Sequence, residues 1–175
     1  MQVEGIVLVT GAGSGIGRAI AQRLAYFGAK ARSRDLGSLE TAAYRVDVRD
    51  ETSVENLVDG VARTYGRIDV FLNTAGLAIT GRCTFQFDMS LADWRSLNEV
   101  HNIGCFLLTR AVLRVMDKQA AVEPISTFSD RPPIRGAIVM LTSLASEGTF
   151  RGVGNYIAAK HAVKGMVQIV AIENA

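Results

Sequence analysis

The sequence predicts an α/β fold in which a doubly wound parallel sheet is flanked by helices on both faces. Short continuous apolar runs at residues 6–9, 68–72 and 137–142 have the length and composition of strands that are buried on both sides. Between these runs lie segments whose apolar side chains recur at helical spacing. Because strands that alternate with helices along a chain pair in parallel, this pattern predicts a three-layer αβα sandwich.

Length and composition indicate one domain. The chain of 175 residues is long enough for one sizeable core and too short for a second full domain, and 49% of its residues are hydrophobic. Its 19 basic and 17 acidic residues form no long run of one sign, so nucleic acid is not an expected partner. We therefore expect a single domain over residues 1–175.

The sequence favours a soluble cytoplasmic protein. No apolar stretch approaches the roughly 20 residues of a membrane-spanning helix, and the N-terminus has no basic leader segment. Cys83 and Cys105 are too few to staple a secreted domain and have no histidine at metal-ligand spacing. Neither a membrane partner nor a metal site is expected.

The first half of the chain alternates strands with helices. In order, its predicted elements are a strand at 6–9, a helix at 16–27 that Gly28 closes, strand ends at Asp35 and at 46–48, a helix face at 54–61 and a strand at 68–72.

In the second half, Ser90 and Asp93 form a capping box before a long helical pattern that continues to Met116. Residues 119–135 hold three prolines and are predicted to be a loop at the amino ends of the strands. Ligands of such sheets bind at the carboxyl ends, so this loop is expected to lie far from the chemistry. A last buried strand at 137–142 and a final helix at 156–172 complete the pattern.

A glycine-rich turn lies where the first strand gives way to the first helix. Glycines allow the backbone to turn sharply and to approach a pyrophosphate, and the helix N-terminus offers free N–H donors with a partial positive charge. In this context the pattern predicts a dinucleotide site. Its expected contacts are Gly11, Ser14, Gly15, Ile16 and Gly17.

Asp35 follows this turn at the expected end of the second strand. A carboxylate there can accept hydrogen bonds from the adenosine ribose and would repel a 2′-phosphate, which favours NAD over NADP. Arg32 and Arg34 make the same strand polar and could instead bind a 2′-phosphate, so NADP remains the alternative.

Tyr156 and Lys160 are one helical turn apart, which places both side chains on one face of the final helix. Ser143 follows the last predicted strand and therefore opens toward the same side. With the glycine turn, Asn73-Thr74-Ala75-Gly76 and Asn102, these residues resemble the short-chain dehydrogenase/reductase family over nearly the whole chain. Thr74 stands where the family more often has asparagine.

The resemblance implies a Rossmann-type fold and a catalytic set. Tyr156 would exchange a proton with the substrate oxygen while hydride passes to or from the nicotinamide. The cation of Lys160 would favour the phenolate form of Tyr156, and its ammonium group would bind the nicotinamide ribose. Ser143 would hold the substrate oxygen, and Asn102 would bend its helix and hold a water that links Lys160 to solvent.

The resemblance also implies further contacts. Asn73, Ala75 and Gly76 would line the cofactor, while the side chain of Asp47 and the backbone of Val48 would flank the adenine. His101 and His161 are interpreted as non-catalytic. A homotetramer or homodimer is implied, with the helix from about Ser90 to Lys118 and the helix of Tyr156 packed against their copies.

The predicted reaction interconverts a secondary alcohol and a ketone. Substrate contacts are expected from residues 77–87 and 144–155, where Leu144, Phe150 and Val153 suggest an apolar wall and an apolar substrate. A dehydratase or epimerase that uses the same fold is an alternative.

The chain departs from the family pattern in two places. The segment between Asp35 and Asp47 is too short for the second crossover helix, and no C-terminal substrate-lid region follows the final helix. We therefore expect that the sequence omits segments of a longer protein. The alternative is a truncated, non-catalytic family member that acts as a binding or pairing module.

Overall fold

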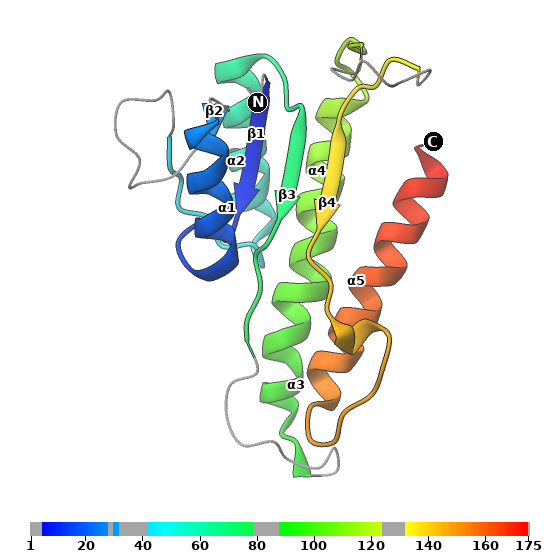
Figure 1. Cartoon of the computed structure of the whole chain (residues 1–175). Coiled ribbons are helices and arrows are strands. Elements are labelled where there is room, and N and C mark those ends of the chain that lie inside the picture. Colours follow the sequence, from blue (N-terminus) through cyan, green and yellow to red (C-terminus); the bar gives the residue numbers. More distant parts are fainter. Residues whose placement is uncertain (1–4, 28–29, 32–41, 79–87, 124–131, 175) are drawn as a thin grey trace.

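A computed structural model describes residues 5–27, 42–78, 88–123 and 132–174, together with the backbone of 30–31. Four parallel strands form one sheet in the order β2-β1-β3-β4 (Figure 1). The strands are β1 (Ile6–Thr10), β2 (Lys30–Ala31), β3 (Val70–Asn73) and β4 (Ala137–Met140). The helices are α1 (Gly15–Tyr26), α2 (Glu51–Tyr65), α3 (Leu91–Asn98), α4 (Cys105–Met116) and α5 (Gly154–Glu173).

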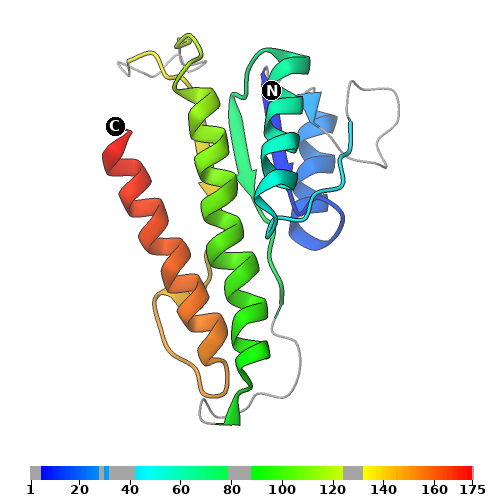
Figure 2. The same cartoon turned by 180° about the vertical axis from the view of Figure 1, so that it is seen from behind.

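Helices lie on both faces of the sheet, which confirms the predicted doubly wound α/β architecture. α1 covers one face, and α2, α4 and α5 lie behind the other (Figures 1 and 2). Phe71 of β3 is fully buried and belongs to the main core, which β3 shares with side chains of α2 and α4. Val7 and Val9 point to the opposite face and pack against Leu24 of α1. This alternation along the strands explains why their runs are continuously apolar.

Local signals set the helix ends. Asp50 caps α2 by accepting a hydrogen bond from the backbone N–H of Ser53 at 2.6 Å. Gly66 ends the same helix in the left-handed conformation, with φ of 78°. Ser90 accepts a hydrogen bond from the N–H of Asp93, so the predicted capping box begins α3.

The long helix after Ser90 is continuous but changes its winding. Between α3 and α4 lies a segment of π-helix, η2 (Glu99–Gly104). Of its residues, His101 and Gly104 are buried. Such wider turns often occur at functional sites. This one turns His101 inward, toward the sheet and α5.

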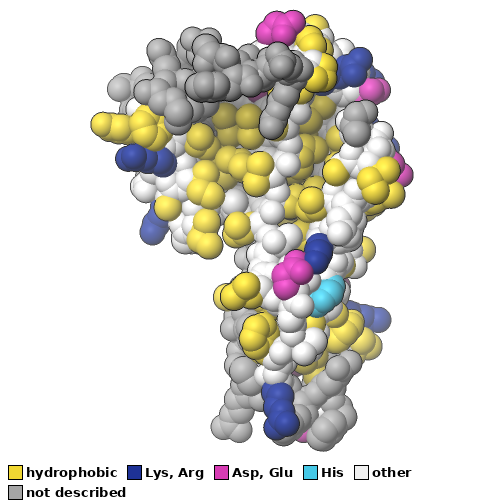
Figure 3. Space-filling view, turned by 45° about the vertical axis from the view of Figure 1, so that its right-hand side comes forward, with side chains coloured by type: hydrophobic (Ala, Val, Ile, Leu, Met, Phe, Trp, Pro, Cys, Tyr) yellow, Lys and Arg dark blue, Asp and Glu magenta, His cyan; other side chains and the backbone are white. Residues whose placement is uncertain are grey.

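Two strand predictions were wrong. Residues 46–48 form no strand and pair with no described strand. β4 was predicted to be buried, yet Val139 is 53% exposed. Val139 lies on the face of the sheet that α1 covers, and no other described helix packs on that face. Hydrophobic side chains therefore gather there on the surface (Figure 3).

The described ends of the proline-rich connection, residues 119–123 and 132–135, lie at the amino ends of the strands, as predicted. An antiparallel bridge pairs Val122 with Ile134, and both residues lie beyond the end of α4 and before β4. Residues 124–131 lie outside the described part of the chain. The turn between β1 and α1 and the segment that follows β4 lie at the opposite end of the sheet (Figure 1). Ser143 belongs to the segment after β4.

Candidate active site

The glycine turn is held against the end of β3 by side chains of both strands. Thr10 donates its hydroxyl to the side-chain oxygen of Asn73 at 2.8 Å, and Thr74 donates to the carbonyl of Thr10 at 2.5 Å. Gly11 adopts φ of 72°, and a Cβ on Gly17 would collide with the Thr74 hydroxyl. Thr74 therefore replaces the family's asparagine without leaving the turn unsupported.

The turn leaves room for a ligand on its outer side. A Cβ on Gly13 or Gly15 would meet nothing within 4 Å, and the side chain of Ser14 does not cap α1. The first N–H groups of α1 are thus available for an anion, and the first turn of the helix holds no acidic residue that would compete. The residues present fit the pyrophosphate of a dinucleotide.

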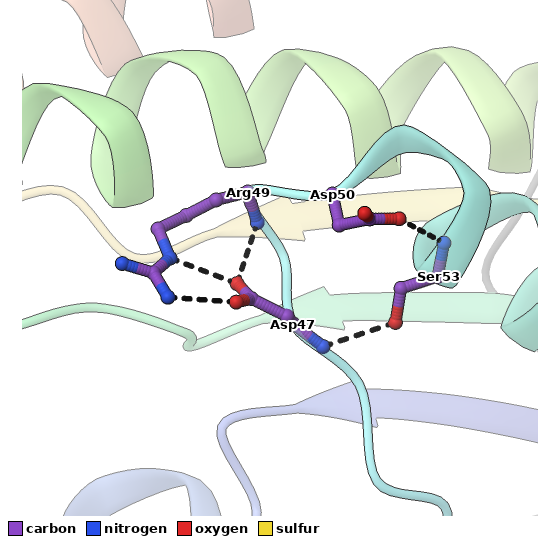
Figure 4. Close-up of polar contacts among 4 residues, drawn as sticks. All are labelled: Asp47, Arg49, Asp50 and Ser53. Carbon is purple, nitrogen blue, oxygen red and sulfur yellow. Dashed lines mark hydrogen bonds and ion pairs between the residues drawn. The ribbon is translucent and has the colours of Figure 1, made fainter.

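Asp47 is held by Arg49 in the turn before α2 (Figure 4). The guanidinium of Arg49 donates to both carboxylate oxygens, at 2.9 and 2.7 Å, and the Arg49 N–H donates to Oδ1 at 3.0 Å. These hydrogen bonds lower the pKa of Asp47 to about 2. The carboxylate is exposed and ionised, as an acceptor for an adenine amino group would need to be.

Val48 ties this turn to the long helix. A Cβ on Gly104 would lie 2.9 Å from Cγ2 of Val48, so the glycine in η2 permits the close approach. The position of Val48 is therefore fixed by packing against η2, the helical segment that carries Asn102. Asp35, Arg32 and Arg34 lie outside the described residues.

Lys160 lies beneath Tyr156 on α5, as their spacing predicts. Its Nζ atom is 5.7 Å from the centre of the Tyr156 ring and donates to the carbonyl of Leu141 at 2.9 Å. Only 5% of Lys160 is exposed, and this burial lowers the pKa of its ammonium group. The thiol of Cys105 is also buried, its pKa is raised by desolvation, and it lies close enough to affect Lys160.

Ser143 lies beyond the carboxyl end of β4 and begins the short 3-10 turn η3 (Leu144–Ser146). Its Oγ accepts a hydrogen bond from the N–H of Ala145 at 3.2 Å, and its carbonyl accepts one from the Ser146 hydroxyl. The turn packs on α5, which carries Tyr156 and Lys160. Ser143, Tyr156 and Lys160 thus come from adjoining elements at the carboxyl end of the sheet.

His101, which the sequence analysis interprets as non-catalytic, lies directly beside Tyr156. Its ring meets that of Tyr156 edge-on, with centroids 5.7 Å apart and planes at 87°. Its Nε2 atom is 3.1 Å from the N of Leu77 and 2.9 Å from the O of Leu77. Asn102, its neighbour, is partly buried and makes no side-chain hydrogen bond within the described residues. A histidine at a buried helical position carries no sequence signal that separates it from an ordinary core residue.

The three residues of the predicted apolar wall differ in their burial. Val153 is buried at the start of α5, whereas Leu144 and Phe150 are exposed. Phe150 lines a hollow with Trp94, Ile157 and His161, and Tyr156 does not line this hollow. Leu77 and Ala78 of the other predicted substrate segment are exposed, and residues 79–87 lie outside the described part of the chain.

Within the described residues, no group of three or more histidine, cysteine, aspartate or glutamate side chains could hold a metal ion. The same part of the chain has no helix with the length and apolar character needed to span a membrane.

Known proteins resemble this chain in sequence and in fold. A family model described as short chain dehydrogenase matches residues 5–175. Levodione reductase of Leifsonia aquatica is 35% identical over 96% of this chain and 63% of its own length. D-threitol dehydrogenase of Mycolicibacterium smegmatis is 34% identical over 96% of this chain and 64% of its own. The ligand-free aldohexose dehydrogenase structure of Thermoplasma acidophilum matches with a TM-score of 0.79 at 27% identity, covering 98% of this chain and 62% of that one.

Proposed function

The chain belongs to the short-chain dehydrogenase family, and on this basis we propose that it interconverts a secondary alcohol and a ketone with a nicotinamide cofactor. The cofactor supplies the acceptor or donor of a hydride. The observation that carries the proposal is the buried Lys160 ammonium group beneath the ring of Tyr156, at the same end of the sheet as an open glycine turn.

In this proposal Tyr156 moves the proton. As the alcohol is oxidised, the phenolate accepts the hydroxyl proton, and in the reverse direction the phenol returns it to the ketone oxygen. The Lys160 cation favours the phenolate by its charge and binds the nicotinamide ribose. Ser143 donates a hydrogen bond to the substrate oxygen. Asn102 holds a water that connects Lys160 to solvent.

We propose that the cofactor is NAD. The pyrophosphate would lie on the N–H groups around Ser14, Gly15 and Ile16, and the adenine between the Asp47 carboxylate and the backbone of Val48. Asn73, Ala75 and Gly76 would line the remaining cofactor surface. Asp35 would bind the ribose hydroxyls and exclude a 2′-phosphate. NADP would be preferred only if Arg32 and Arg34 attracted the 2′-phosphate more strongly than Asp35 repelled it.

An apolar alcohol or ketone is the proposed substrate. Similar proteins include a levodione reductase, a D-threitol dehydrogenase and an aldohexose dehydrogenase. The exposed side chains of Leu77 and Leu144 follow β3 and β4 at the carboxyl end of the sheet and support an apolar contact surface.

We propose that two or four copies assemble through the long helix and α5. Exposed apolar side chains lie on both of these helices, which run side by side (Figure 2). They are Leu91, Ile103, Phe106, Val167, Ile169 and Ile172. Burial of such surfaces against a copy would remove apolar area from water.

The proposal extends to the whole chain and its setting. Residues 1–175 would form one nucleotide-binding domain without the second crossover helix, and residues 42–47, the described part of that segment, form neither helix nor strand. The proposed compartment is the cytoplasm, because Cys105 is buried as a free thiol.

The proposed function is tested by following NADH and NADPH absorbance with a panel of alcohols and ketones. We expect turnover with NADH, and a loss of roughly 10²- to 10⁴-fold in kcat for Tyr156→Phe with little change in NADH affinity. Tyr26→Phe, a change of the same kind at an exposed site on α1, is the matched control. Equal turnover by the Tyr156→Phe variant would refute the assigned proton transfer.

A further inference from the structure

His101 stands between two parts of the candidate site that come from distant parts of the chain. On one side its ring packs edge-on against Tyr156 of α5, with the ring planes at 87°. On the other side its Nε2 atom lies within hydrogen-bond distance of the backbone of Leu77, just after β3. Edge-to-face pairs hold a ring in a preferred orientation as well as burying it.

The backbone after β3 fits closely over this imidazole. A Cβ on Gly76 would lie 2.5 Å from Cε1 of His101, so a side chain at residue 76 would force this imidazole to shift. The same segment, from Asn73 to Gly76, is the proposed cofactor-lining turn. A substitution at His101 is therefore expected to disturb both the proposed cofactor-lining turn and the ring of Tyr156, which is proposed to transfer the proton.

His101 is poorly placed to transfer a proton itself. Its ring is 3% exposed, and Nε2 is already bound to the Leu77 backbone as donor or acceptor, according to the tautomer. Burial lowers the pKa of the imidazole, and the nearby Lys160 cation lowers it further, while the hydrogen bond to Leu77 opposes this. The ring is therefore expected to be neutral at ordinary pH.

We propose that His101 is a positioning residue. It holds the Tyr156 ring and the Leu77 backbone in the relative positions that hydride and proton transfer require. This inference rests on the proposed function. It differs from the role given above to Asn102, which concerns a water near Lys160. Hydride transfer needs reacting atoms aligned within a fraction of an ångström, so a loosened Tyr156 ring is expected to slow chemistry before it weakens binding.

Three variants separate the two contacts of His101. His101→Phe keeps an aromatic ring against Tyr156 but cannot bond Leu77. His101→Gln places an amide near the position of Nε2, within reach of Leu77, but removes the ring. His101→Leu removes both contacts at similar bulk. His161→Gln, on the exposed side of α5, is the matched control.

Two measurements on the intact protein need no substrate. In protein labelled with ¹³C in the tyrosine rings, the Tyr156 signal, assigned by its loss in Tyr156→Phe, reports the ring contact. NADH binding, followed by fluorescence, reports the turn at Leu77. We expect the Tyr156 signal to survive in His101→Phe and to shift in His101→Gln. NADH affinity should fall about tenfold in His101→Phe and remain near wild type in His101→Gln.

Kinetics then connect these contacts to catalysis, with whichever alcohol or ketone gives turnover. We expect kcat to fall roughly a hundredfold in His101→Gln and His101→Leu, with a smaller loss in His101→Phe. A merely structural histidine would lower both readouts together, in step with thermal stability. That result, or a folded His101→Leu protein with wild-type NADH affinity and Tyr156 signal, would overturn the inference.

Failure of the proposed function gives a different result. A protein that turns over no alcohol or ketone, but in which the Phe and Gln variants still separate the Tyr156 signal from NADH affinity, would contradict the dehydrogenase reaction and keep the coupling through His101.

Discussion

Lys160 donates a hydrogen bond to the carbonyl of Leu141 at 2.9 Å while its Nζ atom lies 5.7 Å from the centre of the Tyr156 ring. The carbonyl fixes the ammonium group at the end of β4, where it remains below the phenol. Burial there disfavours the charged form and lowers the pKa of Lys160. A buried cation is expected to cost stability, and this cost agrees with the catalytic role proposed for Lys160.

Replacement of Lys160 by methionine should therefore stabilise the protein near neutral pH and abolish turnover. The gain is expected to be about 1 kcal/mol, or about 3 °C in Tm, with the lost hydrogen bond to Leu141 opposing part of it. Because the folded-state pKa is lowered, the unfolded chain binds more protons between that pKa and the ordinary value of 10.5. Wild-type stability rises with pH in that window.

Thermal unfolding of both proteins across this pH range checks the prediction. The advantage of Lys160→Met should be largest near pH 7 and should shrink as the wild-type lysine loses its proton in the folded state. Lys164→Met, at a more exposed lysine that pairs with Glu147, controls for the loss of a charge on α5. A difference in Tm that does not change with pH would contradict a lowered Lys160 pKa.

The glycine turn predicts a contrast between two substitutions. Gly17→Ala should destabilise the free protein by about 1–3 kcal/mol, because its Cβ would collide with Thr74 and lie 2.5 Å from the Gly11 carbonyl oxygen. Gly13→Ala meets nothing within 4 Å and should leave the free energy of unfolding within about 0.5 kcal/mol. It should nevertheless weaken NADH binding at least tenfold, because the Cβ enters the space proposed for the pyrophosphate.

Urea unfolding and NADH titration of the two variants separate these effects. Wild-type NADH affinity in Gly13→Ala would mean that the open side of the turn does not face the cofactor.

The sequence was sufficient for the architecture because its signals are local and repeated. The run at β1, the turn at Gly11–Gly17 and the capping box at Ser90 each follow from backbone chemistry that a few neighbouring residues decide. Tyr156 and Lys160 could be paired for the same reason, since one helical turn places them on one face.

Contacts made across the fold could not be predicted in this way. His101 owes its position to a π-helical turn and to Leu77 on another element, and neither has a signature in the residues beside it. Val139 was assigned to a buried strand because its composition is apolar. Its burial depends on what covers the sheet, which the apolar run itself does not record.

Asp47 should contribute to cofactor binding as a carboxylate at every ordinary pH. Arg49 lowers the pKa of Asp47 to about 2. This carboxyl group therefore loses its charge only when the pH falls well below the range in which aspartate usually titrates. We expect Asp47→Asn to weaken NADH binding about three- to tenfold, equally at about pH 5 and about pH 8.

NADH titrations at the two pH values check this, with Asp59→Asn on the exposed side of α2 as the control. An effect confined to one pH would indicate a titrating group other than Asp47, and no effect would place the adenine elsewhere.

Assembly should depend on Phe106. This side chain is 45% exposed on α4, with the Arg110 guanidinium 5.1 Å from the centre of its ring, and Ile103 beside it is 48% exposed. A stable interface buries about 800 Å² per partner around a few apolar anchors, and aromatic side chains are frequent among them. Phe106→Glu would place a charge at such an anchor, where desolvation is unfavourable, and is expected to convert the assembly into monomers.

Size-exclusion chromatography with light scattering measures the mass directly. Tyr26→Glu is the matched control, because Tyr26 is an exposed aromatic residue on α1, on the opposite face of the sheet. If the long helix and α5 form the interface, only the Phe106 variant loses mass, and its loss should grow on dilution, since association is a mass-action equilibrium. A wild-type monomer, or equal effects of the two substitutions, would mean that the exposed face of α4 does not bind a second copy.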